Sequence, residues 1–468
     1  MQIITCCYGN NSISEKTEIN INEFPKYFSP ETWEVIQQMN EQGALIDGKI
    51  VALIDTPVEY IAGLTDKNTQ GQKIDNNFPI IAQPIYHGTG VASVIASTPC
   101  RLSCHNENYV TTKPCDKLML VVAGIAQNIK LVNFPFTEKL SDINNVLQNL
   151  VVNVDQLIDE QKQDIQTSRK QIPTKVILNF SFAVDGIEEA RKNDLQNMRI
   201  QLDTLSLQYP NNLEFQWGIS YIDNMLSWSP PVAILSGQPA LQKRWNNLQK
   251  LVDRLMMKHD TELELLEKAM KDNLLPRQDD FLVVMAAGNR GAELTSDNAG
   301  FLAKNLNMEN DPIIAVAAGC GKDYIQLCDF SNFGSVVDIL APGEHIPVIY
   351  PVKSDDGKST IGKATYVSGT SFSAPMVAGA LTLLAQCNPT ASVQDIKKAL
   401  FESAYQVPEL ETRVANGRVL NIKGAVELMC ERDPASHSEK PLNYINIVNS
   451  KTNKKFTTNG LDKLRDEL

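Results

Sequence analysis

Four polar residues occupy local settings suited to nucleophilic acyl transfer. That chemistry needs a hydroxyl, a base, a carboxylate that orients the base, and hydrogen-bond donors for the oxyanion. Ser371 lies in GTSFSAP (369–375), where a serine that begins a helix meets the free amides of the helix N-terminus. His87 opens HGTG, Asp55 follows the apolar run KIVALI, and Asn289 ends VVMAAGN. We predict Asp55, His87 and Ser371 as catalytic residues, and Asn289 as an oxyanion donor beside the Ser371 amide.

The elements that must position these residues alternate between apolar strands and helices. Strands are predicted at 49–54, 118–122, 129–134, 176–182, 282–286 and 313–317, and helices at 30–42, 87–96, 141–158, 241–270, 371–384 and 392–403. Residues 183–240 show no clear hydrophobic periodicity. Strands that are apolar throughout and alternate with helices predict an α/β fold, doubly wound, with a mainly parallel sheet and helices on both faces. Open sheets of this kind carry their functional groups at the carboxyl ends of the strands.

The order Asp55, His87, Ser371, each in its own block, resembles that of the subtilases, the subtilisin-like serine peptidases of the S8 family. The resemblance extends over about residues 49–400. It implies a subtilisin-like fold and a protease that hydrolyses peptide bonds of a protein or peptide substrate through an acyl-enzyme. By family analogy, two segments contact the substrate. Ser181, Phe182 and Ala183 edge the cleft, and Ala286, Ala287 and Gly288 line the pocket for the side chain before the scissile bond.

The chain departs from the family pattern at three places. Pro57 stands where a glycine is usual, so the loop after Asp55 must run differently. Gly90 replaces a common second histidine, and the cleft edge at 181–183 lacks a glycine. These departures favour a narrow substrate preference. They also leave open two alternatives, a catalytically weak subtilase-fold binding scaffold and a processing or transpeptidating enzyme.

We expect three regions: an N-terminal arm at 1–48, a peptidase domain at 49–430 and a polar C-terminal tail at 431–468. A helical insertion at about 185–280 interrupts the domain and contains the amphipathic stretch 241–270. The insertion either packs its apolar face on the domain or forms a lid or a surface for a protein partner.

Composition excludes several other functions. The formal net charge is −12, which argues against nucleic-acid binding, and no apolar run is long enough to span a membrane. No cleaved signal peptide is visible and the nine cysteines are odd in number, so we expect free thiols and a cytoplasmic protein. Export by a route without a cleaved signal peptide is the alternative. The last four residues, RDEL, resemble an endoplasmic-reticulum retrieval signal, which we interpret as coincidence.

No cofactor is required by this chemistry, and no metal site is predicted. Cys100, Cys104, His105 and Cys115 could form a zinc set, but their spacing lacks compact CxxC pairs, so free or disulfide-bonded cysteines are favoured. Many subtilases bind structural calcium, yet no acidic loop here has the pattern of a calcium site.

Overall fold

The structure is a computed structural model of the chain of 468 residues. It describes residues 19–43, 50–59, 69–70, 87–104, 119–127, 129–135, 159, 176–181, 185–209, 213–226, 268, 272, 279–295, 311–353 and 360–431. The predicted helices 141–158 and 241–270 and the predicted tail 431–468 lie almost wholly outside these residues.

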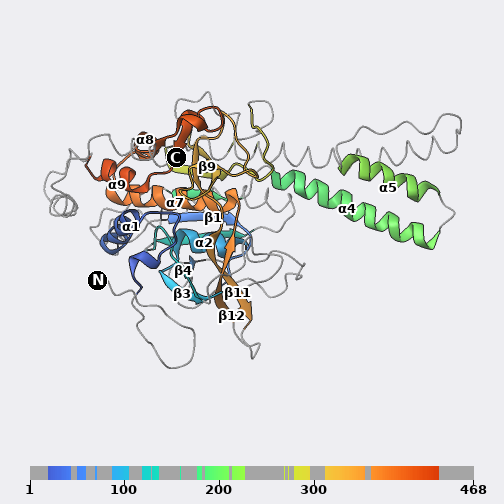
Figure 1. Cartoon of the computed structure of the whole chain (residues 1–468), viewed down its shortest axis with the longest axis horizontal. Helices are drawn as coiled ribbons and strands as arrows, with labels where there is room; N and C mark the ends of the chain where they lie inside the picture. The colour runs from blue at the N-terminus through green and yellow to red at the C-terminus, as the bar shows by residue number, and fades with distance from the viewer. Residues whose placement is uncertain are drawn as a thin grey trace.

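A ten-stranded, mainly parallel sheet forms the centre of the molecule (Figure 1). Its order is β13-β14-β10-β8-β7-β6-β1-β5-β2, with β9 paired to β8. The bounds are β1 Ile50–Asp55, β2 Thr69–Gln70, β5 Lys130–Pro135, β6 Val176–Phe180, β7 Phe281–Ala286, β8 Ile313–Cys320, β9 Gln326–Leu327, β10 Ile339–Pro342, β13 Tyr405–Gln406 and β14 Arg418–Val419. The predicted α/β fold with a mainly parallel sheet is therefore confirmed.

The central strands are apolar throughout because both faces of the sheet are buried. In β1, Val51 and Leu53 enter one core, whereas Ala52 and Ile54 enter the other. Five described helices cover the first face: α1 Pro30–Gly43, α2 His87–Ala96, α7 Thr370–Cys387, α8 Val393–Glu402 and α9 Ile422–Glu431. The second core is closed in part by Leu410 and Val414.

Two antiparallel hairpins complete the body beside α2. They are β3 Cys100–Ser103 with β4 Met119–Val122, and β11 Ile346–Lys353 with β12 Thr360–Val367. The Ser93 hydroxyl of α2 accepts a hydrogen bond of 3.1 Å from the Ile349 amide, which ties β11 to the helix.

The N-terminal segment 19–43 packs into the same core as the sheet. Trp33 is 1% exposed and its indole N–H donates to the Pro25 carbonyl at 2.9 Å. Asn40 donates to the Ile125 carbonyl at 2.8 Å and accepts from the Gln127 amide at 2.7 Å. Buried hydrogen bonds of this kind make α1 a part of the domain's structure.

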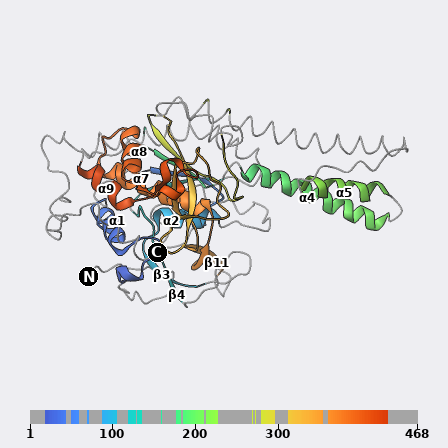
Figure 2. The same cartoon turned by 45° about the horizontal axis from the view of Figure 1, so that its top comes forward.

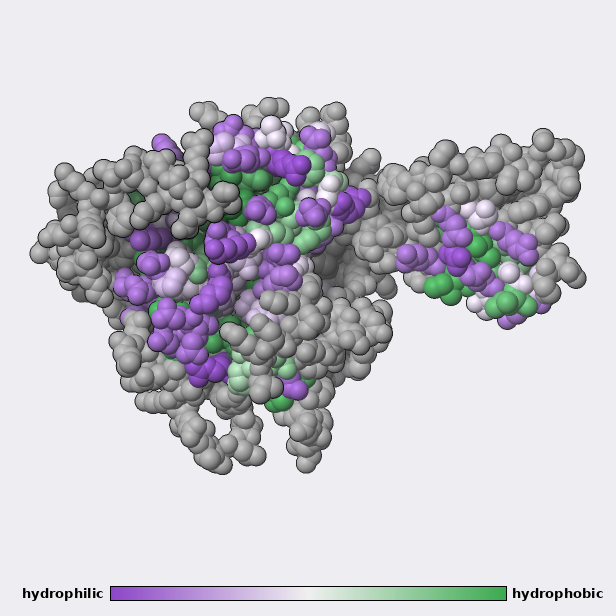
Figure 3. Space-filling view, viewed as in Figure 1, coloured by the Kyte–Doolittle hydropathy of each residue, from purple (hydrophilic) through white to green (hydrophobic). Residues whose placement is uncertain are grey.

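A helical hairpin projects from the body after β6. It consists of α4 Asp185–Gln208 and α5 Leu213–Leu226, and it extends well away from the sheet in both views (Figures 1 and 2). Arg199 of α4 joins the two helices through Asp223, with Nε–Oδ1 at 2.5 Å, and also pairs with Asp203. Leu207 at 83% and Ile200 at 59% are exposed on α4, where Figure 3 shows apolar surface among hydrophilic residues.

Two disulfides contradict the expectation of free thiols for four cysteines. Cys320 is bonded to Cys328, and Cys387 to Cys430. The first links β8 to the end of β9, and the second links α7 to α9. Cys104 is also disulfide-bonded.

Candidate active site

Asp55 and His87 form a hydrogen-bonded pair at the carboxyl end of β1. Asp55 is the last residue of β1, and His87 is the first residue of α2. His87 Nδ1 lies 2.7 Å from Asp55 Oδ1, and the Asp55 side chain is 3% exposed. A carboxylate in this position fixes the imidazole ring and its tautomer, with the proton on Nδ1. Nε2 is then the nitrogen that can accept a proton.

Thr56 connects the strand end to the start of the helix. Its amide donates to Asp55 Oδ1 at 2.7 Å, and its hydroxyl accepts from the Gly88 amide at 2.8 Å. The loop then passes Pro57 and returns to α2, where the Glu59 amide donates to Thr89 Oγ1 at 2.8 Å. The proline predicted to redirect this loop therefore coexists with an intact contact between Asp55 and His87.

The surroundings of His87 act on its pKa in opposite directions. Burial lowers the pKa by disfavouring the imidazolium, whereas the charge of Asp55 and its hydrogen bond raise it. The net result is a pKa above the ordinary histidine value. The pair therefore stabilises the protonated imidazole, the form that a general base takes once it has accepted a proton.

Ser371 lies in the first turn of α7, whose N-cap is Gly369 with φ of +152°. The side chain of Ser371 is partly exposed, and no hydrogen bond of its hydroxyl is found among the described residues. The ring centroid of the next residue, Phe372, is 5.5 Å from that of His87, so α7 begins beside His87. Hydrogen bonds between a nucleophile and its base are often long before substrate binds.

The second serine of the motif has a different environment. Ser373 is fully buried, and its hydroxyl donates to the Pro342 carbonyl at 3.1 Å. Ser373 thus ties α7 to the end of β10, and Ser371 is the serine of this motif whose side chain remains accessible.

Asn289 lies next to the N-cap of α7, three residues after β7. Its Oδ1 accepts from the Thr370 amide at 2.9 Å and from the Thr370 hydroxyl at 3.0 Å. The Gly288 amide in turn donates to Thr370 Oγ1 at 3.1 Å. Because Oδ1 faces Thr370, the amide orientation is set, and Nδ2 lies on the side of Gly369. Asn289 is exposed, as an oxyanion donor must be.

The predicted substrate-contacting residues are placed only in part. Ser181 directly follows β6, but its side chain is 1% exposed and accepts from Asn179 Nδ2 at 2.8 Å. Phe182 and Ala183 lie outside the described residues. Ala286 and Ala287 are buried, and Gly288 has φ of +107°. Gly288 thus turns the chain from β7 toward Asn289 with a backbone geometry that favours glycine.

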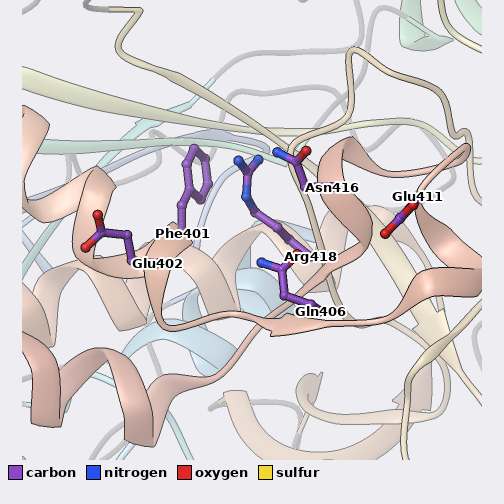
Figure 4. Close-up of a pocket in the computed structure, with 6 residues that line it drawn as sticks. All are labelled: Phe401, Glu402, Gln406, Glu411, Asn416 and Arg418. Atoms are coloured by element: carbon purple, nitrogen blue, oxygen red, sulfur yellow. The ribbon is translucent and has the colours of Figure 1, made fainter.

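A separate hollow of about 520 Å³ lies at the C-terminal side of the domain (Figure 4). It is lined by Phe401, Glu402, Gln406, Glu411, Asn416 and Arg418, and it contains none of the predicted catalytic residues. The Arg418 guanidinium lies 4.5 Å from the centre of the Phe401 ring.

Sequence reasoning missed Thr56, Thr370 and Phe372 as parts of the site. Each is adjacent in sequence to a predicted residue, and the two threonines carry hydroxyls at loop positions where such groups bond to nearby backbone. Their position next to the predicted residues was the sequence signal that could have identified them. Among the described residues no group of three or more His, Cys, Asp or Glu side chains comes together, and none of the described helices is long and apolar enough to cross a membrane.

Part of the chain matches a known protein family. Residues 217–426, a segment that includes Asn289 and Ser371, match the subtilase family profile. The matched segment resembles a subtilase-family serine peptidase and covers less than half of the chain. It is 34% identical over 173 residues to one component of the subtilase cytotoxin of Escherichia coli, covering 34% of this chain and 47% of that protein. It is 36% identical over 137 residues to thermitase of Thermoactinomyces vulgaris, covering 28% of this chain and 44% of thermitase.

These matches span less than half the length of each relative. A solved structure described as the structural basis of subtilase cytotoxin SubAB assembly is 21% identical, with a TM-score of 0.48. That superposition covers 91% of this chain and the whole of the other. Asp55 and His87 precede the matched segment 217–426, so their assignment depends on the contact between them and on the residue order.

Proposed function

We propose that this protein is a subtilisin-like serine endopeptidase with Asp55, His87 and Ser371 as its triad. The observation that carries the proposal is the 2.7 Å contact between His87 Nδ1 and Asp55 Oδ1. The His87 ring also packs beside the ring of Phe372, so this pair lies next to the first turn of α7. A base oriented in this way, next to an accessible serine, is the arrangement needed to activate a hydroxyl.

The reaction proceeds in two acyl-transfer steps. His87 Nε2 takes the proton of Ser371 as Oγ attacks the scissile carbonyl, and Asp55 stabilises the imidazolium. The protonated imidazole then gives its proton to the leaving amine, which leaves an acyl group on Ser371. Water repeats the sequence with His87 as base and releases the acid.

The oxyanion is stabilised by Asn289 Nδ2 and the Ser371 amide. The contacts of Asn289 Oδ1 with Thr370 support this role, because they leave the donor end of the amide beside Gly369, just before the nucleophile. Donors held in advance do not have to reorganise as negative charge develops on the carbonyl oxygen.

The substrate is a protein or peptide with a narrow sequence preference. The proposal of narrowness depends on Phe182 and Ala183, which put side chains where the family has a glycine. The helical hairpin is the candidate surface for a protein partner, since Ile200 and Leu207 are exposed there.

The disulfides favour export over a cytoplasmic location, because such bonds persist mainly in oxidising compartments. Maleimide labelling of the denatured, unreduced protein, read by mass, tests this directly. Cys320, Cys328, Cys387 and Cys430 should all remain unlabelled, and labelling of the four would support the cytoplasm.

A fluorophosphonate probe and a mixed peptide library test the activity. The wild type should be labelled and should cleave a small subset of peptides, and Ser371→Ala should lose both properties. Ser373→Ala is the matched control and should retain labelling, because its hydroxyl is buried against Pro342. Folded wild-type protein with no Ser371-dependent cleavage would instead support a binding scaffold, and products joined to an amine would support transpeptidation.

A further inference from the structure

The loop that carries Asn289 is bonded along its length to a second loop. The first is 287–292, after β7, and the second is 330–333, after β9. The Gly291 amide donates to the Phe330 carbonyl at 2.7 Å, and the Phe333 amide donates to the Ala292 carbonyl at 3.0 Å. Asn289 itself is exposed. Its position in space therefore depends on how the backbone on either side is held.

One side chain, that of Asn332, holds the backbone on both sides of Asn289. Its Oδ1 accepts from the Arg290 amide at 3.1 Å and from the Ala292 amide at 3.0 Å. Its Nδ2 donates to the Ala287 carbonyl at 2.9 Å. The Asn332 amide also donates to the Gly288 carbonyl at 2.9 Å, and the residue is fully buried.

A carboxamide is the group that this arrangement requires. The loop presents two N–H donors and one carbonyl acceptor to Asn332, so the side chain must both accept and donate. Aspartate keeps the acceptors but places a buried carboxylate against the Ala287 carbonyl. Serine is too short to bridge the three groups. Buried backbone groups left without a partner are costly, so either change should favour a different loop conformation.

We propose that Asn332 is a positioning residue for the oxyanion donor. By fixing Ala287 on one side and Arg290 and Ala292 on the other, it holds the Asn289 amide where the developing oxyanion forms. Stabilisation of this kind requires donors within 2.7–3.1 Å of the oxyanion, a tolerance that a loosened loop does not meet. The inference deepens the proposed peptidase function and rests on it.

The test is a double-mutant cycle between Asn332 and Asn289. Asn332→Ser and Asn289→Ala are made singly and together, and kcat and KM are measured on one peptide substrate of the wild type. Asn332→Ser should lower kcat by about 10-fold to 100-fold with KM nearly unchanged, because donor position matters most in the transition state. In the Asn289→Ala background, where the donor is already absent, Asn332→Ser should lower kcat by less than about threefold.

Asn40→Ser is the matched control. Asn40 is also a buried asparagine, 3% exposed, whose amide bridges backbone groups of two segments. Asn40→Ser should lower the midpoint of thermal unfolding as Asn332→Ser does. Its kcat should stay within about twofold of the parent protein in both the wild-type and the Asn289→Ala backgrounds. Hydrogen exchange of the Arg290 and Ala292 amides adds a readout independent of activity, and it should accelerate only in Asn332→Ser.

The outcomes separate the inference from the function on which it rests. The role of Asn332 is overturned if the fold losses in kcat of the two single variants multiply in the double variant. It is also overturned if kcat of Asn332→Ser equals that of Asn40→Ser. Either result leaves the peptidase assignment standing. A folded wild type without Ser371-dependent cleavage overturns both. Coupled losses, with faster exchange in the 287–292 loop, establish the positioning role.

Discussion

Gly88 permits the close approach of α2 to the loop after β1, and Gly88→Ala tests whether that approach matters for catalysis. A Cβ on Gly88 would lie 2.1 Å from the Thr56 carbonyl oxygen. Ordinary contacts of a Cβ atom begin near 3.4 Å, so helix and loop must separate by about 1.3 Å. The opposing atom belongs to the backbone and cannot rotate away. This separation should lengthen two contacts between the helix and the loop. They are the hydrogen bond from the Gly88 amide to the Thr56 hydroxyl, of 2.8 Å, and the contact of His87 with Asp55, of 2.7 Å.

A displacement of about 1 Å in a catalytic group costs on the order of 100-fold in rate, or about 2.7 kcal/mol of transition-state stabilisation. We therefore expect kcat/KM of Gly88→Ala to fall by about 100-fold, measured on one peptide substrate well below the unfolding temperature. Gly90→Ala, one half-turn along the same helix, is the control. A Cβ there meets Phe372 at 3.4 Å and Val348 at 3.5 Å, which are ordinary contacts. Activity of Gly88→Ala within twofold of wild type, or an equal loss in Gly90→Ala, would refute this reasoning.

Four further predictions concern His87, Asp55, Ser373 and Trp33. Because His87 must be neutral to act as base and its pKa is raised, the acidic limb of the pH profile of kcat/KM should lie above about pH 6.5. Asp55→Asn removes the negative charge that raises this pKa and leaves only a neutral hydrogen-bonding partner, so the limb should move to lower pH. The same change should lower kcat by on the order of 10⁴, a magnitude taken from triad enzymes including subtilisin. A limb that stays in place would contradict the role of Asp55. Ser373→Ala leaves the Pro342 carbonyl without its partner and should lower the free energy of unfolding by about 1–3 kcal/mol, measured by urea denaturation, without changing labelling of the active site. Trp33→Ala should lower the free energy of unfolding by about 3–5 kcal/mol in the same measurement, because Trp33 is buried. The protein that remains folded should keep its kcat. A loss below about 1 kcal/mol would place α1 outside the domain core.

Much of the sheet and the pairing of Asp55 with His87 could be predicted from the sequence, because short apolar runs and strand ends are local signals. The helix predicted at 87–96 has these bounds in the structure, and the strand predicted at 49–54 is β1 at 50–55. Helices α4 and α5 were not predicted individually within the expected insertion. They project from the body, so packing on the core imposes little periodicity on them.

The hydrogen bonds that set the site were beyond sequence reasoning for another reason. Asn332 lies 43 residues after Asn289, and its three side-chain contacts exist only once β8 and β9 have brought the two loops together. The disulfides were misjudged in the same way, because pairing depends on which cysteines the fold makes neighbours. Cys387 and Cys430 are separated by 43 residues, yet α7 and α9 bring their Cα atoms within 4.9 Å.

The site consists of two halves that the sheet keeps apart. Asp55 ends β1 and Asn289 follows β7, and β6 lies between these strands. With strands spaced by about 4.8 Å, the two strand ends are separated by about 10 Å. The first turn of α7 contacts both halves, through Phe372 against His87 and through Thr370 against Asn289. Ser371 lies between these two contacts in sequence. In the proposed triad, the start of this helix sets Ser371 beside both His87 and Asn289. The buried hydrogen bond of Ser373 to the Pro342 carbonyl separately ties the helix to β10.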